Sequence, residues 1–311
     1  MKLSVNKTLS QAKRHAKKGE IARSAELYNT ILAEFPGNRH ARQGLAALGV
    51  APAPPADMSP FGQEMNTLTA LYGQRRLVEV VEKGNALVKE FPEETALLNI
   101  LGAANAGLGR LDDAVDSFRR AISVDPGVAE AHYNHGLALK NKGDLAAAIE
   151  NYKRAIEIRP AYPEAFYNLG IALRATGDLT ASIDSYRQAV KFNPRYAKAH
   201  QNLGNALRSM GDPEGALESY NHALRIQPEM SELHISQGDT LAEIRRYDEA
   251  ITALERALKI DSESREAKGI LGTTLMRVGR LEEGLAFQDE GFGVITFHAK
   301  SGVTINTGIQ A

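Results

Sequence analysis

The chain has 311 residues, 37 Lys and Arg against 38 Asp and Glu, and a formal net charge of −1. It has no Cys, which excludes disulfide and thiolate chemistry, and its near-neutral charge argues against nucleic-acid binding, which needs a phosphate-neutralising basic surface. No stretch approaches the ~18 apolar residues of a membrane span. The N-terminus also lacks the apolar segment of a secretory signal, so the expected location is the cytoplasm.

The first predicted unit is a small helical repeat over residues 1–48. Gly19 marks a turn between two helices in residues 5–38, and a short helix follows in residues 38–48. Residues 1–24 hold seven Lys or Arg against one Glu. The apolar side of this segment is small, so the sequence favours a solvated face over a membrane contact.

A Pro-rich linker is predicted over residues 49–60, which contain four prolines. Such a segment cannot continue a helix and favours an extended spacer. We therefore expect the N-terminal unit to be set off from a repeat array over residues 61–291.

A series of glycines defines that array. Gly recurs every 34 residues, and a fixed period of this length is typical of stacked helical repeats. The repeats begin at 95, 129, 163, 197 and 231, with a degenerate repeat over 61–94 and a partial one from 265. In residues 129–162 we expect helices from Ala129 to Asn141 and from Leu145 to Ile158, with Asp144 capping the second. The glycines are Gly102, Gly136, Gly170, Gly204, Gly238 and Gly272.

The small and aromatic residues around each glycine recur at the same offsets. Around Gly170, for example, stand Phe166, Leu169, Tyr186 and Pro194. The pattern resembles the tetratricopeptide repeat (TPR). The resemblance implies an all-α fold, a right-handed TPR superhelix or α-solenoid, with a concave groove that binds peptides or proteins.

The period fails at the C-terminus. Gly291 and Gly293 should stop the last helix early. The β-rich runs 294–297 and 303–305 flank a turn at 300–302, which predicts a β-hairpin tail over residues 292–311. We expect it to pack on the last helices, to form a dimer contact that would make the protein a homo-oligomer, or to begin a domain that this chain lacks.

The candidate binding site is a row of amides on the first helix of each repeat. Asn134, Asn168 and Asn202 occupy the sixth position of three consecutive repeats, and Asn205 joins them one turn on. An amide offers one acceptor and two donors, so such a row can hold the backbone of an extended peptide. The row resembles the asparagine ladder in the TPR superhelix of O-GlcNAc transferases. The alternative is that Asn simply suits this solvated position.

Two further rows flank the amides. Lys140, Arg174 and Arg208 share the twelfth position and would favour an acidic ligand. Glu130 and Glu164 partly offset this charge, and the alternative is an ordinary solvated face. The fifth position carries Tyr133 and Tyr167, which would supply flat anchoring contacts.

No cofactor or metal is expected. His132 and His135 lie three residues apart, but His132 shares the aromatic packing position of its repeat with His200 and His234 in theirs. No catalytic motif is present, so the leading hypothesis is a non-enzymatic protein-interaction scaffold. The alternative is a substrate-targeting module for a glycosyl-, sulfo- or oxygenase-type enzyme supplied by another chain.

Overall fold

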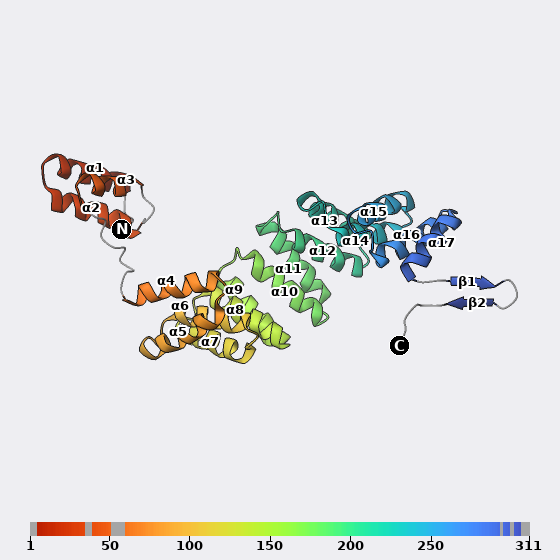
Figure 1. Ribbon diagram of the computed structural model, residues 1–311, viewed down its shortest axis with the longest axis horizontal. Coiled ribbons are helices and arrows are strands. Elements are labelled where there is room, and N and C mark those ends of the chain that lie inside the picture. Colours follow the sequence, from red (N-terminus) through yellow and green to blue (C-terminus); the bar gives the residue numbers. More distant parts are fainter. Residues whose placement is uncertain (1–4, 35–38, 51–59, 293–294, 299–301, 306–311) are drawn as a thin grey trace. The chain divides into compact units, whose positions relative to one another are not determined.

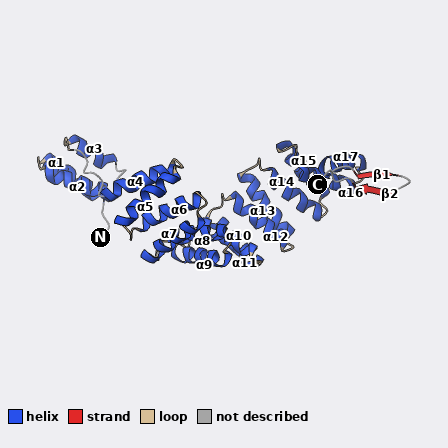
Figure 2. Ribbon diagram, turned by 60° about the horizontal axis from the view of Figure 1, so that its bottom comes forward, coloured by secondary structure: helices blue, strands red, loops and turns tan. Residues whose placement is uncertain are grey.

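The computed structural model describes residues 5–34, 39–50, 60–292, 295–298 and 302–305. The described residues form seventeen helices that follow one another along the chain (Figure 1; helices blue in Figure 2). The chain divides into two compact units, residues 1–108 and 109–311.

The first unit contains α1 (Val5–Lys17), α2 (Ile21–Glu34), α3 (Arg39–Ala47), α4 (Pro60–Gly73), α5 (Leu77–Glu90) and α6 (Thr95–Gly107). Its first three helices pack around Tyr28 and Leu45, which are buried. Helices α4 to α6 pack around a second cluster that includes Leu68 and Val80. The division of this region into an N-terminal unit, a linker and a repeat array, with boundaries at 48 and 60, stays a prediction. Residues 51–59 of the expected linker lie outside the described residues.

The second unit contains one leading helix and five helix pairs, in which the first helix of each repeat packs on the second. The helices are α7 (Leu111–Val124), α8 (Ala129–Lys142), α9 (Leu145–Ile158), α10 (Pro163–Ala175), α11 (Leu179–Phe192), α12 (Ala197–Ser209), α13 (Pro213–Ile226), α14 (Ser231–Glu243), α15 (Tyr247–Ile260), α16 (Arg265–Arg277) and α17 (Leu281–Phe292).

The 34-residue glycine series marks the place where the two helices of a repeat approach most closely. A Cβ atom added at Gly204 would lie 2.5 Å from the ring of Tyr220, which is fully buried. At Gly238 the corresponding neighbour is Leu254, 2.6 Å away. The missing side chain therefore makes the space that a large residue of the second helix fills, and the recurring glycine is a packing requirement.

The turns inside the repeats follow the sequence prediction. Gly143 ends α8 with φ +93°, a conformation that favours glycine. The side chain of Asp144 then accepts a hydrogen bond of 3.1 Å from the backbone N–H of Ala147 and so caps α9, as predicted. At the equivalent turn after α14, Arg245 adopts φ 63° instead.

The last repeat ends early, as the glycines predict. Helix α17 stops at Phe292 and has 12 residues, whereas the second helices before it have 14. Gln288 is buried in it and donates a hydrogen bond of 2.8 Å to the carbonyl oxygen of Gly269.

The predicted fold class needs a correction at the C-terminus. The architecture is an all-helical solenoid, because helices and the turns between them supply every buried side chain of the described residues. Two four-residue strands, β1 (Ile295–His298) and β2 (Gly302–Ile305), follow the last helix and pair antiparallel with each other, with Ile295 opposite Ile305 (red in Figure 2). An isolated hairpin is marginal in water, and α17 closes the last repeat without it. Of the turn predicted at 300–302, residues 300 and 301 lie outside the described residues, and Gly302 begins β2.

Candidate functional site

The predicted site residues share one surface of the second unit. The first helices α8, α10, α12, α14 and α16 follow one another in space, since each pair of neighbours from α8 to α10 and from α12 to α16 is in contact. We call the side that carries repeat positions 5, 6, 9, 12 and 13 of these helices the A-face. Tyr133, Asn134 and Lys140 stand at its positions 5, 6 and 12 in the first of these repeats.

Asn168 is the centre of a buried polar cluster on the A-face. Its Nδ2 donates to the hydroxyl of Tyr133 at 3.2 Å and to the carbonyl oxygen of Glu164 at 3.0 Å. Its Oδ1 accepts from the Nζ of Lys140 at 3.0 Å. Both donors of the amide therefore have partners inside the protein, and the side chain is 7% exposed. The structure brings three predicted site residues together here, as an internal network across α8 and α10.

The tyrosine–asparagine bond repeats one unit further on. The Nδ2 of Asn202 donates to the hydroxyl of Tyr167 at 3.3 Å. The ring of Tyr167 packs against that of Tyr196, with centroids 4.9 Å apart, as Tyr133 packs against Tyr162. Burial raises the pKa of Tyr162 to about 12, with a contribution from Tyr133, so this hydroxyl stays protonated near neutral pH. Both predicted anchor tyrosines are thus half-buried members of aromatic pairs.

Lys140 and Arg174 are cations without a carboxylate partner in the described residues. Burial lowers the pKa of Lys140, and its single described hydrogen bond goes to the neutral amide of Asn168. Arg174 is exposed and makes no ion pair among the described residues. A half-buried ammonium that faces a neutral amide is incompletely compensated, so the described residues leave the positive charge on this part of the A-face unbalanced.

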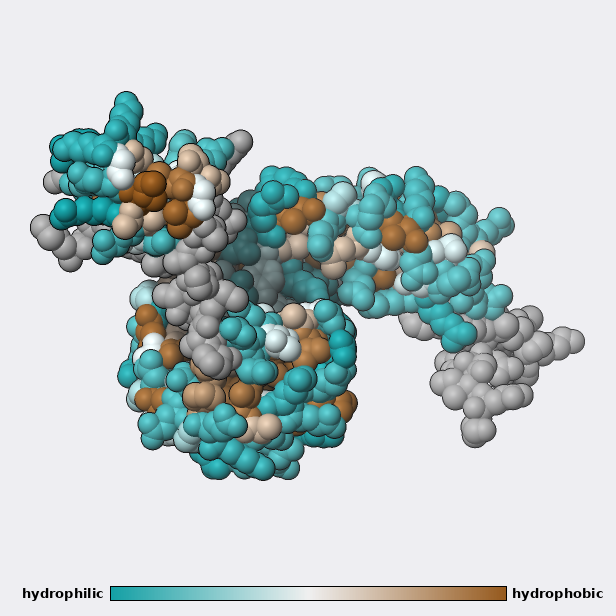
Figure 3. All heavy atoms as spheres, turned by 60° about the vertical axis from the view of Figure 1, so that its left-hand side comes forward, coloured by the Kyte–Doolittle hydropathy of each residue, from teal (hydrophilic) through white to brown (hydrophobic). Residues whose placement is uncertain are grey.

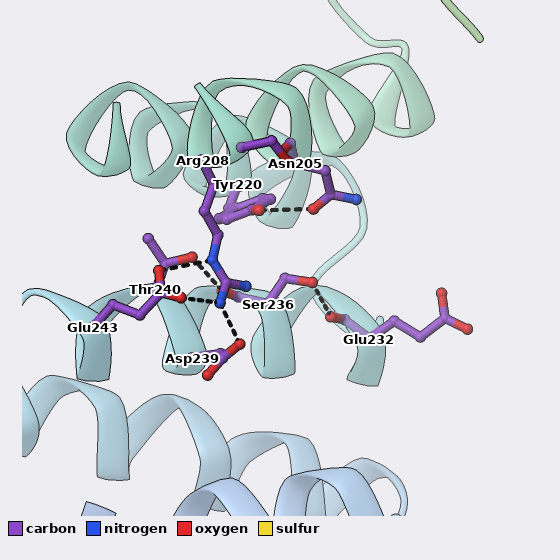
Figure 4. A network of polar contacts seen from close by, with 9 residues as sticks. Asn205, Arg208, Tyr220, Glu232, Ser236, Asp239, Thr240 and Glu243 are labelled. Atoms are coloured by element: carbon purple, nitrogen blue, oxygen red, sulfur yellow. Dashed lines mark hydrogen bonds and ion pairs between the residues drawn. The ribbon is translucent and has the colours of Figure 1, made fainter. Parts of the chain in front are cut away.

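Arg208, the third member of the predicted basic row, is neutralised. It reaches from α12 to α14, where its guanidinium donates to Glu243 at 2.5 and 2.9 Å and to Asp239 at 2.5 Å (Figure 4). These hydrogen bonds, first that of Glu243, raise the pKa of Arg208. The three cations recur at the same repeat position in the sequence, but carboxylates of α14 balance the charge of the third one.

The remaining two asparagines differ in their contacts. The Oδ1 of Asn205 accepts a hydrogen bond of 2.7 Å from the hydroxyl of Tyr220 (Figure 4). Asn134 is partly exposed and makes no side-chain hydrogen bond within the part of the chain that the structure describes. For the Oδ1 of Asn202, likewise, the described residues provide no hydrogen-bond donor, and this residue is also partly exposed.

The histidines have structural partners. The Nε2 of His132 lies 3.1 Å from the carbonyl oxygen of Pro126, and His200 and His234 make the same contact with Pro194 and Pro228. The Nδ1 of His135 lies 3.1 Å from the Oδ1 of Asn151. Among the described residues, no three His, Asp or Glu side chains come together as a metal site.

Sequence reasoning missed the acidic partners of Arg208. Asp239 and Glu243 lie 31 and 35 residues after Arg208, at positions 9 and 13 of the next first helix. The same offsets from Lys140 lead to Ile171 and Ala175, which carry no charge. Comparing position 12 of one repeat with positions 9 and 13 of the next would have revealed the difference.

The surface is mostly polar. On the face drawn in Figure 3, hydrophobic side chains form separate patches among hydrophilic ones. Within the described residues, every helix is too short or too polar to cross a bilayer.

Comparison with known families gives a consistent result. The model of the TPR repeat matches residues 106–143, 136–177 and 170–211, and a second tetratricopeptide-repeat model matches residues 201–265 and 235–291. No curated protein matches the chain in sequence.

Solved structures of TPR proteins share the fold. MamA is 27% identical, with a TM-score of 0.51, over 54% of this chain and 92% of MamA. YrrB, a TPR protein with an unusual peptide-binding site, is 20% identical, with a TM-score of 0.54, over 60% of this chain and 96% of YrrB. The C-terminal part of a TPR repeat-containing protein from Cytophaga hutchinsonii is 15% identical, with a TM-score of 0.63, over 73% and 94%.

The TPR fold is typical of protein-interaction scaffolds, and TPR repeat proteins are generally non-enzymatic. The glycine series, the paired helices and the family matches all agree, and the chain belongs to the tetratricopeptide-repeat family.

Proposed function

We propose that this protein is a non-enzymatic scaffold that binds an extended, acidic peptide segment of a partner protein along the A-face. The observation that carries the proposal is the pair of uncompensated cations in two consecutive repeats. Lys140 is bonded to a neutral amide, and Arg174 has no described ionic partner. A carboxylate placed there would gain two charge-assisted hydrogen bonds that the free protein lacks.

The amides supply the second part of the site. Asn134 and the Oδ1 of Asn202, for which the described residues supply no donor, stand at position 6 of their repeats and would hold the backbone of the peptide. Asn168 has a different role, since its donors already bind Tyr133 and Glu164. It orients Lys140 and thereby positions the cation toward the ligand. YrrB, the structural relative with a described peptide-binding site, gives this use of the fold a precedent.

Affinity capture from native lysate followed by mass spectrometry tests the proposal. The wild-type chain should retain partners that the double variant Lys140→Gln/Arg174→Gln loses. The double variant Lys153→Gln/Arg187→Gln is the matched control, because it removes one Lys and one Arg from exposed positions on the second helices α9 and α11, away from the A-face. Equal capture by all three proteins would sink the proposal. The proposed location of this scaffold and its partner is the cytoplasm.

A further inference from the structure

Each of two spaces between neighbouring first helices is filled by a long cationic side chain from position 12. Lys140 of α8 fills the space next to α10 and bonds to Asn168. Arg208 of α12 fills the space next to α14 and bonds to Asp239 and Glu243 (Figure 4). We call such a space a slot.

The slot between α14 and α16 lacks such a side chain. Position 12 of α14 is Ala242, and position 5 of α16 is Gly269, where two earlier repeats have Tyr133 and Tyr167. A cavity of about 170 Å³ lies there, lined by Ala242, Gly269, Thr274 and their neighbours. Small-molecule sites generally occupy about 300–1,000 Å³, whereas an apolar cavity of about 150 Å³ accommodates one benzene ring. The slot therefore matches a single side chain.

The hydroxyl groups of the slot are already paired. The Oγ1 of Thr273 donates to the carbonyl oxygen of Gly269 at 3.0 Å and accepts from the Nε2 of Gln288 at 2.6 Å. The Oγ1 of Thr274 donates to the carbonyl oxygen of Ile270 at 2.7 Å. Because these donors bind inside the protein, the walls offer methyl and methylene surface to an occupant, and Gln288 fixes the α16 wall in place.

The rim of the slot carries charge on both sides. Asp239 and Glu243 of the α14 wall already bind Arg208. Arg277 of the α16 wall is exposed and makes no ion pair within the described part of the chain. An apolar side chain inside the slot would thus leave Arg277 facing the residue next to it on the ligand, which favours a carboxylate at that place.

We infer that the slot between α14 and α16 is a specificity pocket of the A-face, which takes one aliphatic side chain of leucine or methionine size next to an acidic residue of the bound peptide. This inference rests on the proposed function and adds the sequence feature that the scaffold selects. Burying one aliphatic side chain is worth about 1.5–3 kcal/mol, or roughly tenfold or more in affinity.

A random peptide library displayed on phage, selected against the full chain, tests the inference. We expect the selected peptides to share one Leu, Ile or Met next to Asp or Glu. The variants Ala242→Met and Ala242→Gln fill the slot with a long side chain, and neither adds a charge that could attract the acidic residue of the peptide. Each should weaken the selected peptides by at least about tenfold. Ala286→Met, at an exposed alanine of α17, is the matched control and should leave affinity unchanged.

The outcomes separate the two claims. The pocket is overturned if the selected peptides share no aliphatic position. It is also overturned if both Ala242 variants bind the selected peptides with unchanged affinity, provided that thermal unfolding shows both variants to be folded. The proposed function then stands if Lys140→Gln/Arg174→Gln still weakens those peptides. A library from which no peptide is enriched overturns both claims.

Discussion

The A-face of α8 and α10 and that of α12 and α14 use one repeat position in opposite ways. Lys140 projects toward a next helix whose positions 9 and 13 are Ile171 and Ala175, and it keeps its charge uncompensated. Arg208 projects toward Asp239 and Glu243, whose carboxylates balance its positive charge. The charge of a repeat surface is therefore set by pairs of residues one repeat apart, and cations at the same repeat position do not form equivalent sites.

The packing beneath the A-face also differs from one repeat to the next, and the largest expected effect lies between the repeats of α12 and α14. Gly204→Ala should destabilise the protein by about 2 kcal/mol, since the new methyl would overlap the buried ring of Tyr220. Gly238→Ala should cost less, because its neighbour Leu254 can change rotamer. Thermal unfolding measures both losses. Equal losses would contradict the role of the fixed ring.

The tyrosines that fill the glycine positions differ in their hydroxyl partners. Tyr220→Phe should cost about 1 kcal/mol, because it removes the bond to Asn205. Tyr152→Phe should cost nothing or slightly stabilise, since the Tyr152 hydroxyl is buried without a hydrogen-bond partner among the described residues. Urea unfolding of the two variants separates these cases, and a larger loss for Tyr152→Phe would reverse the assignment.

The two cations should respond differently to the same substitution. Arg208→Gln should cost up to about 1 kcal/mol of stability, a modest amount because the ion pairs are partly exposed to solvent. Lys140→Gln should leave stability unchanged or raise it slightly, since it removes a half-buried cation without a counter-ion. Unfolding at low and high salt measures the contrast, which should shrink for Arg208→Gln as salt rises. A greater loss for Lys140→Gln would show that its charge is compensated after all.

The smallest expected effect is on the pH dependence of stability, and it arises from His135 in α8. Burial lowers the pKa of His135, which faces Asn151, His132 and Arg119. The unfolded chain therefore binds a proton at His135 more tightly than the folded protein does. The contribution of neutral His135 to the free energy of unfolding is complete above about pH 6.5 and is lost as the pH falls through the folded-state pKa. His135→Leu should flatten the stability profile below about pH 6.5. If the profile of His135→Leu is the same as that of the wild type, another group is responsible for the pH dependence. His200→Phe is the control, because burial also lowers the pKa of His200.

Much of the fold follows from the sequence because the packing is periodic. Gly204 predicts a close approach, and Asp144 predicts a cap, from local rules that each repeat obeys again. The prediction that a β tail belongs to the fold class was wrong. It rested on local β propensity, which does not show whether a segment packs into the core of a domain.

The site was less predictable than the fold. The sequence predicted Asn168 and Arg208 as ligand contacts on the first helices of their repeats, but both side chains make their hydrogen bonds to residues inside the protein. The slot beside Ala242 depends on two absent side chains, one in each of two repeats, and only their juxtaposition in space creates it.

The central claim is that a partner lies on the A-face, and photo-crosslinking tests it most directly. A photoreactive amino acid is introduced either at Ala175, exposed on α10 at position 13, or at Asp184, exposed on the second helix α11. Irradiation in native lysate should link the partner to the chain modified at position 175 and should leave the chain modified at position 184 unlinked. Cross-links from position 184 with none from position 175 would place the partner elsewhere and contradict the account.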